Sequence, residues 1–197
     1  MEASLELRDR NLAVIFPGVG YTCAKPLLYY TAAMMQEHGF KVLRLDYGTE
    51  IHTFRGRSDQ DLAPIIELAL LRSMDILNGL PWQEYGQVFF LSKSIGTVVA
   101  CRAAEGLPCR VRHFLMTPIE ATLPWLKKAE GLFVAGTRDP YLATEKIIRA
   151  AKEYPQKVGW LFEGCDHSLE RKNDTRGNIQ NLQKVLECLE EMLTQRE

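Results

Sequence analysis

The stretch from Gln87 to Ala100, with the sequence QVFFLSKSIGTVVA, decides how the rest of the chain is interpreted. Its first half is short, apolar and nearly continuous, which is typical of a strand buried on both faces of a parallel sheet. The residues of its second half are small or apolar, and they predict a helix that follows the strand directly. Ser94 lies at the corner between the two elements. An abrupt corner of this kind forces its residue into a strained, outward-pointing conformation, which is the geometry that a nucleophilic serine needs.

The corner pattern, Ser92-Lys93-Ser94-Ile95-Gly96, is a variant of the Gly-x-Ser-x-Gly nucleophile elbow, with Ser92 in place of the first glycine. A bulky side chain at Ser92 or Gly96 would collide with the neighbouring strand or helix across the turn. A pattern this short also occurs in plain strand-to-helix turns, so it needs support from the rest of the chain.

Strands and helices are predicted to alternate along the chain. Besides residues 87–91, the expected strands are Asn11–Phe16, Lys41–Gly48, Arg112–Pro118, Gly131–Gly136 and Val158–Phe162. Helices are expected from Pro26 to His38, Asp61–Leu77, Gly96–Ala104, Leu142–Ala151 and Gly177–Leu193, the last capped by Asp174 or Thr175. This alternation predicts a doubly wound α/β fold, in which helices flank a mostly parallel sheet of about six strands. We expect residues 1–197 to form one such domain.

Composition excludes several classes of protein. A formal net charge of −1 gives no electrostatic basis for binding nucleic acid or an anionic membrane. The N-terminus has no continuous apolar segment, and no run is long enough to span a membrane. The five cysteines are widely spaced and form no Cys-x-x-Cys pattern, which argues against a disulfide framework and against a zinc site. Reduced thiols in a cytoplasmic protein are therefore expected.

Two further polar residues follow predicted strands. Ligands of a parallel sheet bind at the carboxyl ends of its strands, so residues just after each strand are the ones to inspect. Asp139 follows the fifth strand and His167 follows the sixth, so with Ser94 the chain order is Ser, Asp, His. In this order and context the sequence resembles the α/β-hydrolase family from about Leu12 to the C-terminal helix.

The resemblance implies specific roles. Ser94 would attack an acyl carbonyl, His167 would take and return the proton, and Asp139 would orient the imidazole. The backbone N–H of Ile95 would bind the oxyanion, together with that of Val19 or, as the alternative, Gly20. The implied activity is a serine hydrolase of the carboxylesterase or thioesterase type that acts on a small-molecule ester or thioester without a cofactor or metal.

The chain departs from the family pattern in four places. Ser92 replaces the first elbow glycine, and Pro17 stands where many members have a histidine. The connection from Thr117 to Lys128 is too short for a large lid, so no cap domain is expected, and the N-terminal antiparallel strands of larger members are missing. His52 and Arg55 could line a substrate pocket, although we expect surface positions for them. Lys93 should point away from Ser94.

Two alternatives stay open at this point. Gly18–Cys23 is a Gly-x-Gly-x-x-Gly pattern without its last glycine, and Asp46 ends the next strand, as in dinucleotide-binding proteins. That interpretation leaves Ser94, Asp139 and His167 unexplained. The second alternative is a hydrolase-like protein that binds a ligand without turnover, because a fold alone does not fix an activity.

Overall fold

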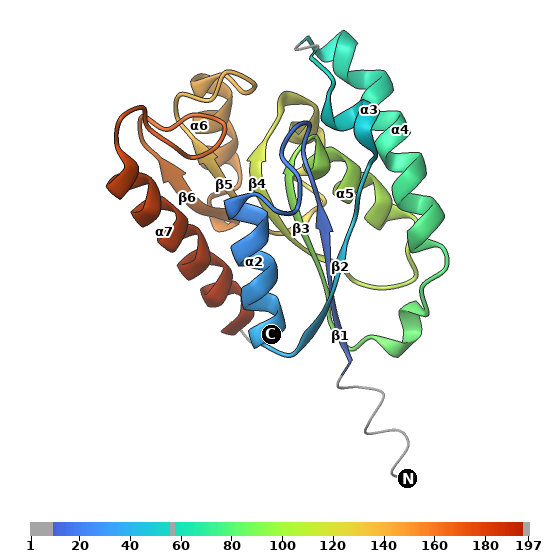
Figure 1. Cartoon of the computed structure of the whole chain (residues 1–197). Helices are drawn as coiled ribbons and strands as arrows, with labels where there is room; N and C mark the ends of the chain where they lie inside the picture. Colours follow the sequence, from blue (N-terminus) through green and yellow to red (C-terminus); the bar gives the residue numbers. More distant parts are fainter. Residues whose placement is uncertain (1–9, 56–57, 195–197) are drawn as a thin grey trace.

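The computed structural model describes residues 10–55 and 58–194, and in this part of the chain six parallel strands form one sheet (Figure 1). The strand order is β2-β1-β3-β4-β5-β6. The strands are β1 (Asn11–Phe16), β2 (Phe40–Arg44), β3 (Val88–Ser94), β4 (Arg112–Pro118), β5 (Glu130–Gly136) and β6 (Val158–Phe162). The doubly wound α/β fold expected from the sequence is therefore confirmed.

Two strands end at other residues than the sequence predicts. β2 stops at Arg44 rather than Gly48, because the Asp46 carboxylate accepts a hydrogen bond from the Gly48 amide at 2.8 Å and turns the chain. β3 continues past Leu91 to Ser94, which pairs with Pro118 of β4 after a register shift. The three polar residues at the end of β3 are thus part of the buried sheet.

Helices cover both faces of this sheet (Figure 1). On one face, α2 (Pro26–Glu37) and α7 (Thr175–Thr194) pack on an apolar cluster that includes Phe89 and Leu91 of β3. On the other, α4 (Asp59–Leu77) and α5 (Ile95–Glu105) pack on a cluster that includes Phe90, and α6 (Thr144–Glu153) packs beside α5. Side chains of β3 alternate between the two clusters, as a strand requires.

The helix starts follow ordinary capping chemistry. Ser58 caps α4, and its side chain and that of Asp61 bond each other's backbone amides in a capping box. Asp174, one of the two expected caps of α7, accepts a hydrogen bond from the Gly177 amide at 3.0 Å. A Cβ at Gly177 would lie 2.2 Å from an Asp174 carboxylate oxygen, so a larger residue there would displace this capping side chain.

The connection between β4 and β5 holds only the short 3-10 helix η2 (Glu120–Trp125), so it carries no inserted cap domain. Between β2 and α4 lies one further short helix, α3 (Thr49–His52), in a segment that the sequence predicts as a loop. Within the described residues, no helix is both long and apolar enough to cross a bilayer.

Phe90 offers a test of the core around β3. Its side chain is fully buried, with its ring 4.7 Å from that of Phe16 and 6.4 Å from that of Trp82. We expect Phe90→Ala to lower the free energy of unfolding by about 3–5 kcal/mol, because the truncated side chain leaves a cavity that close packing cannot fill. The matched control is Leu71→Ala, because Leu71 lies on the outer side of α4 and is 60% exposed. This variant should change the free energy of unfolding by less than about 0.5 kcal/mol. Equal effects of the two variants in urea denaturation would contradict this account.

Candidate active site

The order of the strands places one crevice at the carboxyl edge of the sheet. The chain passes from β1 outward to β2 and then returns to β3 on the other side, so the strand order reverses between β1 and β3. Ligands of open α/β sheets bind at such a switch point. Here the loop after β1 meets the end of β3, because a Cβ on Gly18 would lie 3.0 Å from the Cβ of Ser94.

Ser94 has a strained backbone. Its φ is 58° and its ψ is −126°, a combination that non-glycine residues rarely adopt, and it is the residue before the first turn of α5. The strain is held by close packing, since a Cβ on Gly96 would lie 2.5 Å from the carbonyl oxygens of both Phe16 and Pro17. Thr97 adds a hydrogen bond of 2.6 Å from its hydroxyl to the Ser94 carbonyl. The sharp corner that the sequence predicts is therefore present.

Two side chains from separate loops meet the Ser94 side chain at this corner. His167, in the loop after β6, has its Nε2 2.8 Å from the Ser94 hydroxyl oxygen. Its Nδ1 lies 2.6 Å from a carboxylate oxygen of Asp139, in the loop after β5. The geometry fits one tautomer, in which Nδ1–H donates to Asp139 and Nε2 accepts from the serine hydroxyl. The structure thus brings together the three residues that the sequence singled out.

The surroundings fix Asp139 and His167 in place. The Asp139 side chain is only 1% exposed, and its second carboxylate oxygen accepts a hydrogen bond from the Tyr141 amide at 2.8 Å. The Tyr141 ring lies against the imidazole at 4.6 Å between centroids. Asp166, the neighbour of His167, instead accepts from the amides of Ser168 and Glu170, so it builds the turn and is not the partner acid.

Electrostatics keep the imidazole neutral. Burial lowers the pKa of His167, and the nearby Lys93 cation lowers it further, while the Asp139 carboxylate offsets part of this change. A neutral imidazole can accept a proton, so His167 is available as a general base at neutral pH.

A cavity of about 200 Å³ opens next to Ser94. Five of its lining residues are sequence-predicted site residues: Val19, Gly20, Ser94, Ile95 and His167. The other four are Phe54, Arg55, Leu62 and Tyr141. Sequence reasoning missed three of these four and expected Arg55 at the surface. The position of these residues in the chain could have indicated all four. Each lies in a segment that follows a strand at the carboxyl edge of the sheet, or in the first turns of α4.

Val19 and Gly20, in the loop after β1, line this cavity. Gly18 and Tyr21 close a tight turn by two mutual backbone hydrogen bonds, of 3.0 and 3.3 Å. The turn therefore uses the amides of Gly18 and Tyr21 and leaves those of Val19 and Gly20 at its tip. Gly20 has a φ of 62°, which suits a glycine.

This loop differs from a dinucleotide-binding turn. In such a turn the glycine pattern opens the following helix, whereas here residues 21–25 separate the glycines from α2. Asp46, the candidate ribose ligand, pairs with His52 at 2.9 Å and turns the chain after β2. The strand order also differs from the 3-2-1-4-5-6 order of nicotinamide-binding domains. Among the described residues, no cluster of His, Cys, Asp and Glu is suited to hold a metal ion.

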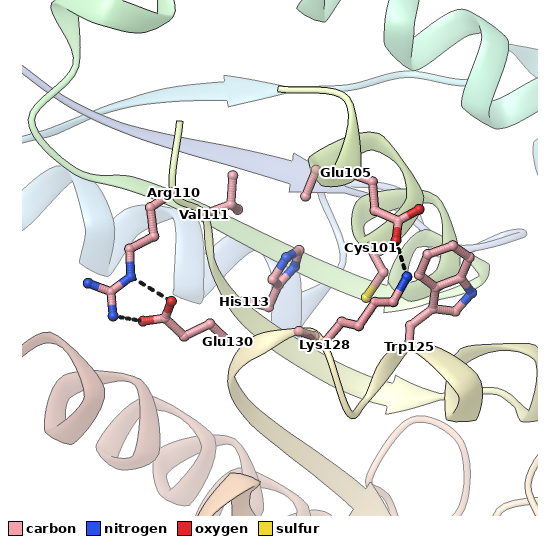
Figure 2. A pocket seen from close by; sticks show the side chains of 10 residues that line it. Cys101, Glu105, Arg110, Val111, His113, Trp125, Lys128 and Glu130 are labelled. Atoms are coloured by element: carbon pink, nitrogen blue, oxygen red, sulfur yellow. Dashed lines mark hydrogen bonds and ion pairs between the residues drawn. The ribbon is translucent and has the colours of Figure 1, made fainter. Parts of the chain in front are cut away.

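A second cavity of about 210 Å³ lies at the opposite edge of the sheet, where β4 and β5 begin (Figure 2). Its rim charges are paired, Arg110 with Glu130 at 2.6 Å and Lys128 with Glu105 at 2.7 Å. Its thiol, Cys101, is no activated nucleophile, because burial raises its pKa to about 12. The candidate site is therefore the cavity at Ser94.

Comparisons with known proteins identify the fold. No protein-family model and no curated protein matches the chain, but solved structures do. Est1E from Butyrivibrio proteoclasticus, solved with ferulic acid bound, has a TM-score of 0.65 at 15% identity, over 95% of this chain and 91% of that one. An alpha-beta serine hydrolase homologue from Coxiella burnetii has a TM-score of 0.64 at 15% identity, over 92% and 85%. An esterase from Pyrococcus furiosus has a TM-score of 0.56 at 12% identity, over 94% and 85%. The chain therefore has the α/β-hydrolase fold.

Proposed function

We propose that this protein is a serine hydrolase that cleaves a carboxylic ester or thioester through an acyl-enzyme. The observation that carries the proposal is the position of His167, which lies within hydrogen-bond distance of both the Ser94 hydroxyl and the Asp139 carboxylate. That constellation, at the end of β3 and on the loops after β5 and β6, is the geometry of nucleophile, base and orienting acid. The hydrolases and esterases among the structural neighbours support the same reaction class.

The reaction would proceed in two stages. Ser94 Oγ attacks the acyl carbon while its proton passes to His167 Nε2, and the resulting tetrahedral intermediate collapses as the imidazolium returns that proton to the leaving alcohol or thiol. Water then attacks the acyl-serine with the same base, which releases the carboxylic acid and restores the serine. Asp139 holds the tautomer throughout and stabilises the transient imidazolium.

The oxyanion of each intermediate needs N–H donors. The Ile95 amide, in the first turn of α5, is one candidate, and the amide of Val19 or Gly20 at the tip of the β1 loop is the other. These amides lie at the wall of the same cavity as Ser94. One such donor typically stabilises the transition state by about 3–4 kcal/mol.

The cavity limits the substrate. A volume of about 200 Å³, walled by Phe54, Leu62 and Tyr141, suits a small acyl group rather than a long lipid chain. The connection after β4 supplies no lid, so a larger leaving group would extend into solvent.

The reaction proposed needs neither a cofactor nor a metal. We place the protein in the reducing cytoplasm, where its five cysteines would stay free thiols.

A fluorophosphonate probe tests the nucleophile. The probe phosphonylates a serine only where a base activates it, so the wild-type protein should carry one adduct on Ser94, located by peptide mass spectrometry, and Ser94→Ala should carry none. Ser168→Ala is the matched control and should label as the wild type does. Ser168 is the next residue after His167, but its side chain forms no hydrogen bond with the imidazole. A labelled protein would then be assayed with p-nitrophenyl esters of graded chain length. Absence of an adduct on the folded wild-type protein would favour a ligand-binding protein, and a thermal-shift assay with NAD(P) would then test the dinucleotide alternative.

Asp139→Asn tests the role of the buried acid. The amide is nearly the same size, but its oxygen would stay on the Tyr141 amide and its NH2 group would donate to Nδ1, which favours the wrong tautomer. It also carries no charge to stabilise the imidazolium, so kcat should fall by about 10³- to 10⁴-fold while the fold is retained. Asp75→Asn is the matched control, since that carboxyl is exposed on α4. Circular dichroism would verify folding of both variants. Comparable activities of the two variants would rule out the role assigned to Asp139.

The rate should fall in acid as His167 gains a proton. Because the pKa of His167 lies below its ordinary value of 6.5, the acid limb of kcat/KM should have its midpoint below pH 6.5 and reach a plateau above it. Stopped-flow or plate-reader assays with a p-nitrophenyl ester across pH 4–7 would measure this limb. A midpoint above 6.5 would contradict the lowered pKa of His167, and a rate independent of pH would count against His167 as the base.

A further inference from the structure

Lys93, the residue directly before Ser94, is a buried cation that the proposed reaction does not use. Its side chain is 2% exposed. It lies on the same side of β3 as Phe89 and Leu91, facing α2 and α7, and so on the opposite side from Ser94. It points away from the nucleophile, as the sequence predicts, and cannot form a serine–lysine pair. A charge buried at this depth is costly unless neighbouring groups compensate it.

The compensating groups belong to the site. Lys93 Nζ lies 4.4 Å from the centre of the Tyr21 ring, which is a cation–π contact. Asp139 and Asp166 are the carboxylates that favour its charged form, and they come from the same two loops that supply the acid and the base. The helices on this face, α2 and α7, bury apolar residues and the Cys188 thiol there. His167 Nε2 lies 2.8 Å from the hydroxyl of Ser94, the residue next to Lys93, and the Lys93 charge lowers the pKa of His167. The Cys165 thiol is also buried on this face.

Tyr21 links this cation to the loop after β1. Its amide and carbonyl close the turn that carries Val19 and Gly20, and its hydroxyl accepts a hydrogen bond from the Leu27 amide at 3.1 Å. The ring is therefore held at both ends, by the turn and by the start of α2, with the ammonium over its face. Burial also raises the pKa of Tyr21 to about 12, so the phenol stays neutral and the contact stays a cation–π contact.

We propose that Lys93 is a positioning residue of this site, whose buried ammonium supports the Tyr21 turn and acts on His167 across the strand that carries Ser94. The inference rests on the proposed function for its catalytic meaning, but the coupling between the two side chains is a property of the protein itself. In a medium of low effective dielectric constant, a unit charge on the far face of one strand acts strongly on a buried imidazole.

Lys93 can lose its charge within the physiological pH range. Burial lowers the pKa of Lys93 to about 7, against the opposing influence of Asp139 and Asp166. Below that pH the ammonium is charged and lowers the proton affinity of His167. Above it the charge is lost, but His167 is then already neutral. The effect is therefore present over the pH range in which the base would otherwise be protonated.

Lys93→Met removes the charge while retaining a flexible side chain of similar length. The pH midpoint of His167 should rise by about half to one pH unit in this variant. It can be measured directly from the His167 ring signals in NMR titrations, assigned by comparison with His167→Gln, and separately from the acid limb of kcat/KM. Lys93→Arg keeps the charge and should restore the wild-type midpoint. Lys128→Met is the matched control, because it removes an exposed cation at the opposite edge of the sheet (Figure 2) and should leave the midpoint unchanged.

Each outcome separates this inference from the proposed function. An unchanged His167 midpoint in folded Lys93→Met would overturn the inference, even if the thermal midpoint or kcat fell, because a structural role alone would produce that pattern. A raised NMR midpoint supports it, also in a protein that hydrolyses no ester and forms no fluorophosphonate adduct. In that case the hydrolase proposal fails and the electrostatic coupling stands.

Discussion

The close approach of α5 to the end of β1 is the contact on which the rest of the site depends. Gly96 lies so near the carbonyl oxygens of Phe16 and Pro17 that no side chain fits between them. Because the helix starts this close to the neighbouring strand, β3 must turn within one residue, and Ser94 takes a positive φ. Its hydroxyl is then lifted out of the sheet toward the loops after β5 and β6. The same approach brings the β1 loop beside Ser94, so one packing constraint positions both the candidate nucleophile and the candidate oxyanion donors.

Charge balance is the second constraint. Asp139 is buried, and in the resting state its partner His167 is neutral, so the hydrogen bond between them does not neutralise the carboxylate. A buried carboxylate needs either hydrogen-bond donors or a cation. The Tyr141 amide supplies one donor, and the Lys93 ammonium supplies a positive charge from the other face of β3. The buried Asp139 side chain is therefore held by an amide donor and lies near a buried cation, while the same cation and burial lower the pKa of His167.

Much of this arrangement could be predicted from the sequence, for identifiable reasons. Parallel strands buried on both faces leave continuous apolar runs, so β1, β4 and β6 were bounded correctly. The position of a residue just after a strand places it at the carboxyl edge, and this was sufficient to select Ser94, Asp139 and His167. The roles of these residues stay proposals until the labelling and substitution experiments are made.

The parts that escaped prediction depend on packing between distant segments. Polar residues at the end of β3 look like a loop, and nothing local shows that Lys93 lies under Tyr21. Phe54 and Leu62 reach the cavity because the chain between β2 and α4 folds over the switch point, through the short helix α3. That path has no periodic pattern. Sequence periodicity reports which face of one element is buried, and it carries no information on which loop lies above it.

The two edges of the sheet show why the candidate chemistry is assigned to one of them. At the edge where β4 and β5 begin, the charged side chains of the rim pair with each other. At the carboxyl edge, a strained serine, a buried carboxylate and a buried ammonium occur together, and each of these features is unfavourable on its own. A sequence that only had to fold would have no reason to gather three such features in one place. Their coincidence at the topological switch point is the strongest structural argument that this edge was shaped for a reaction.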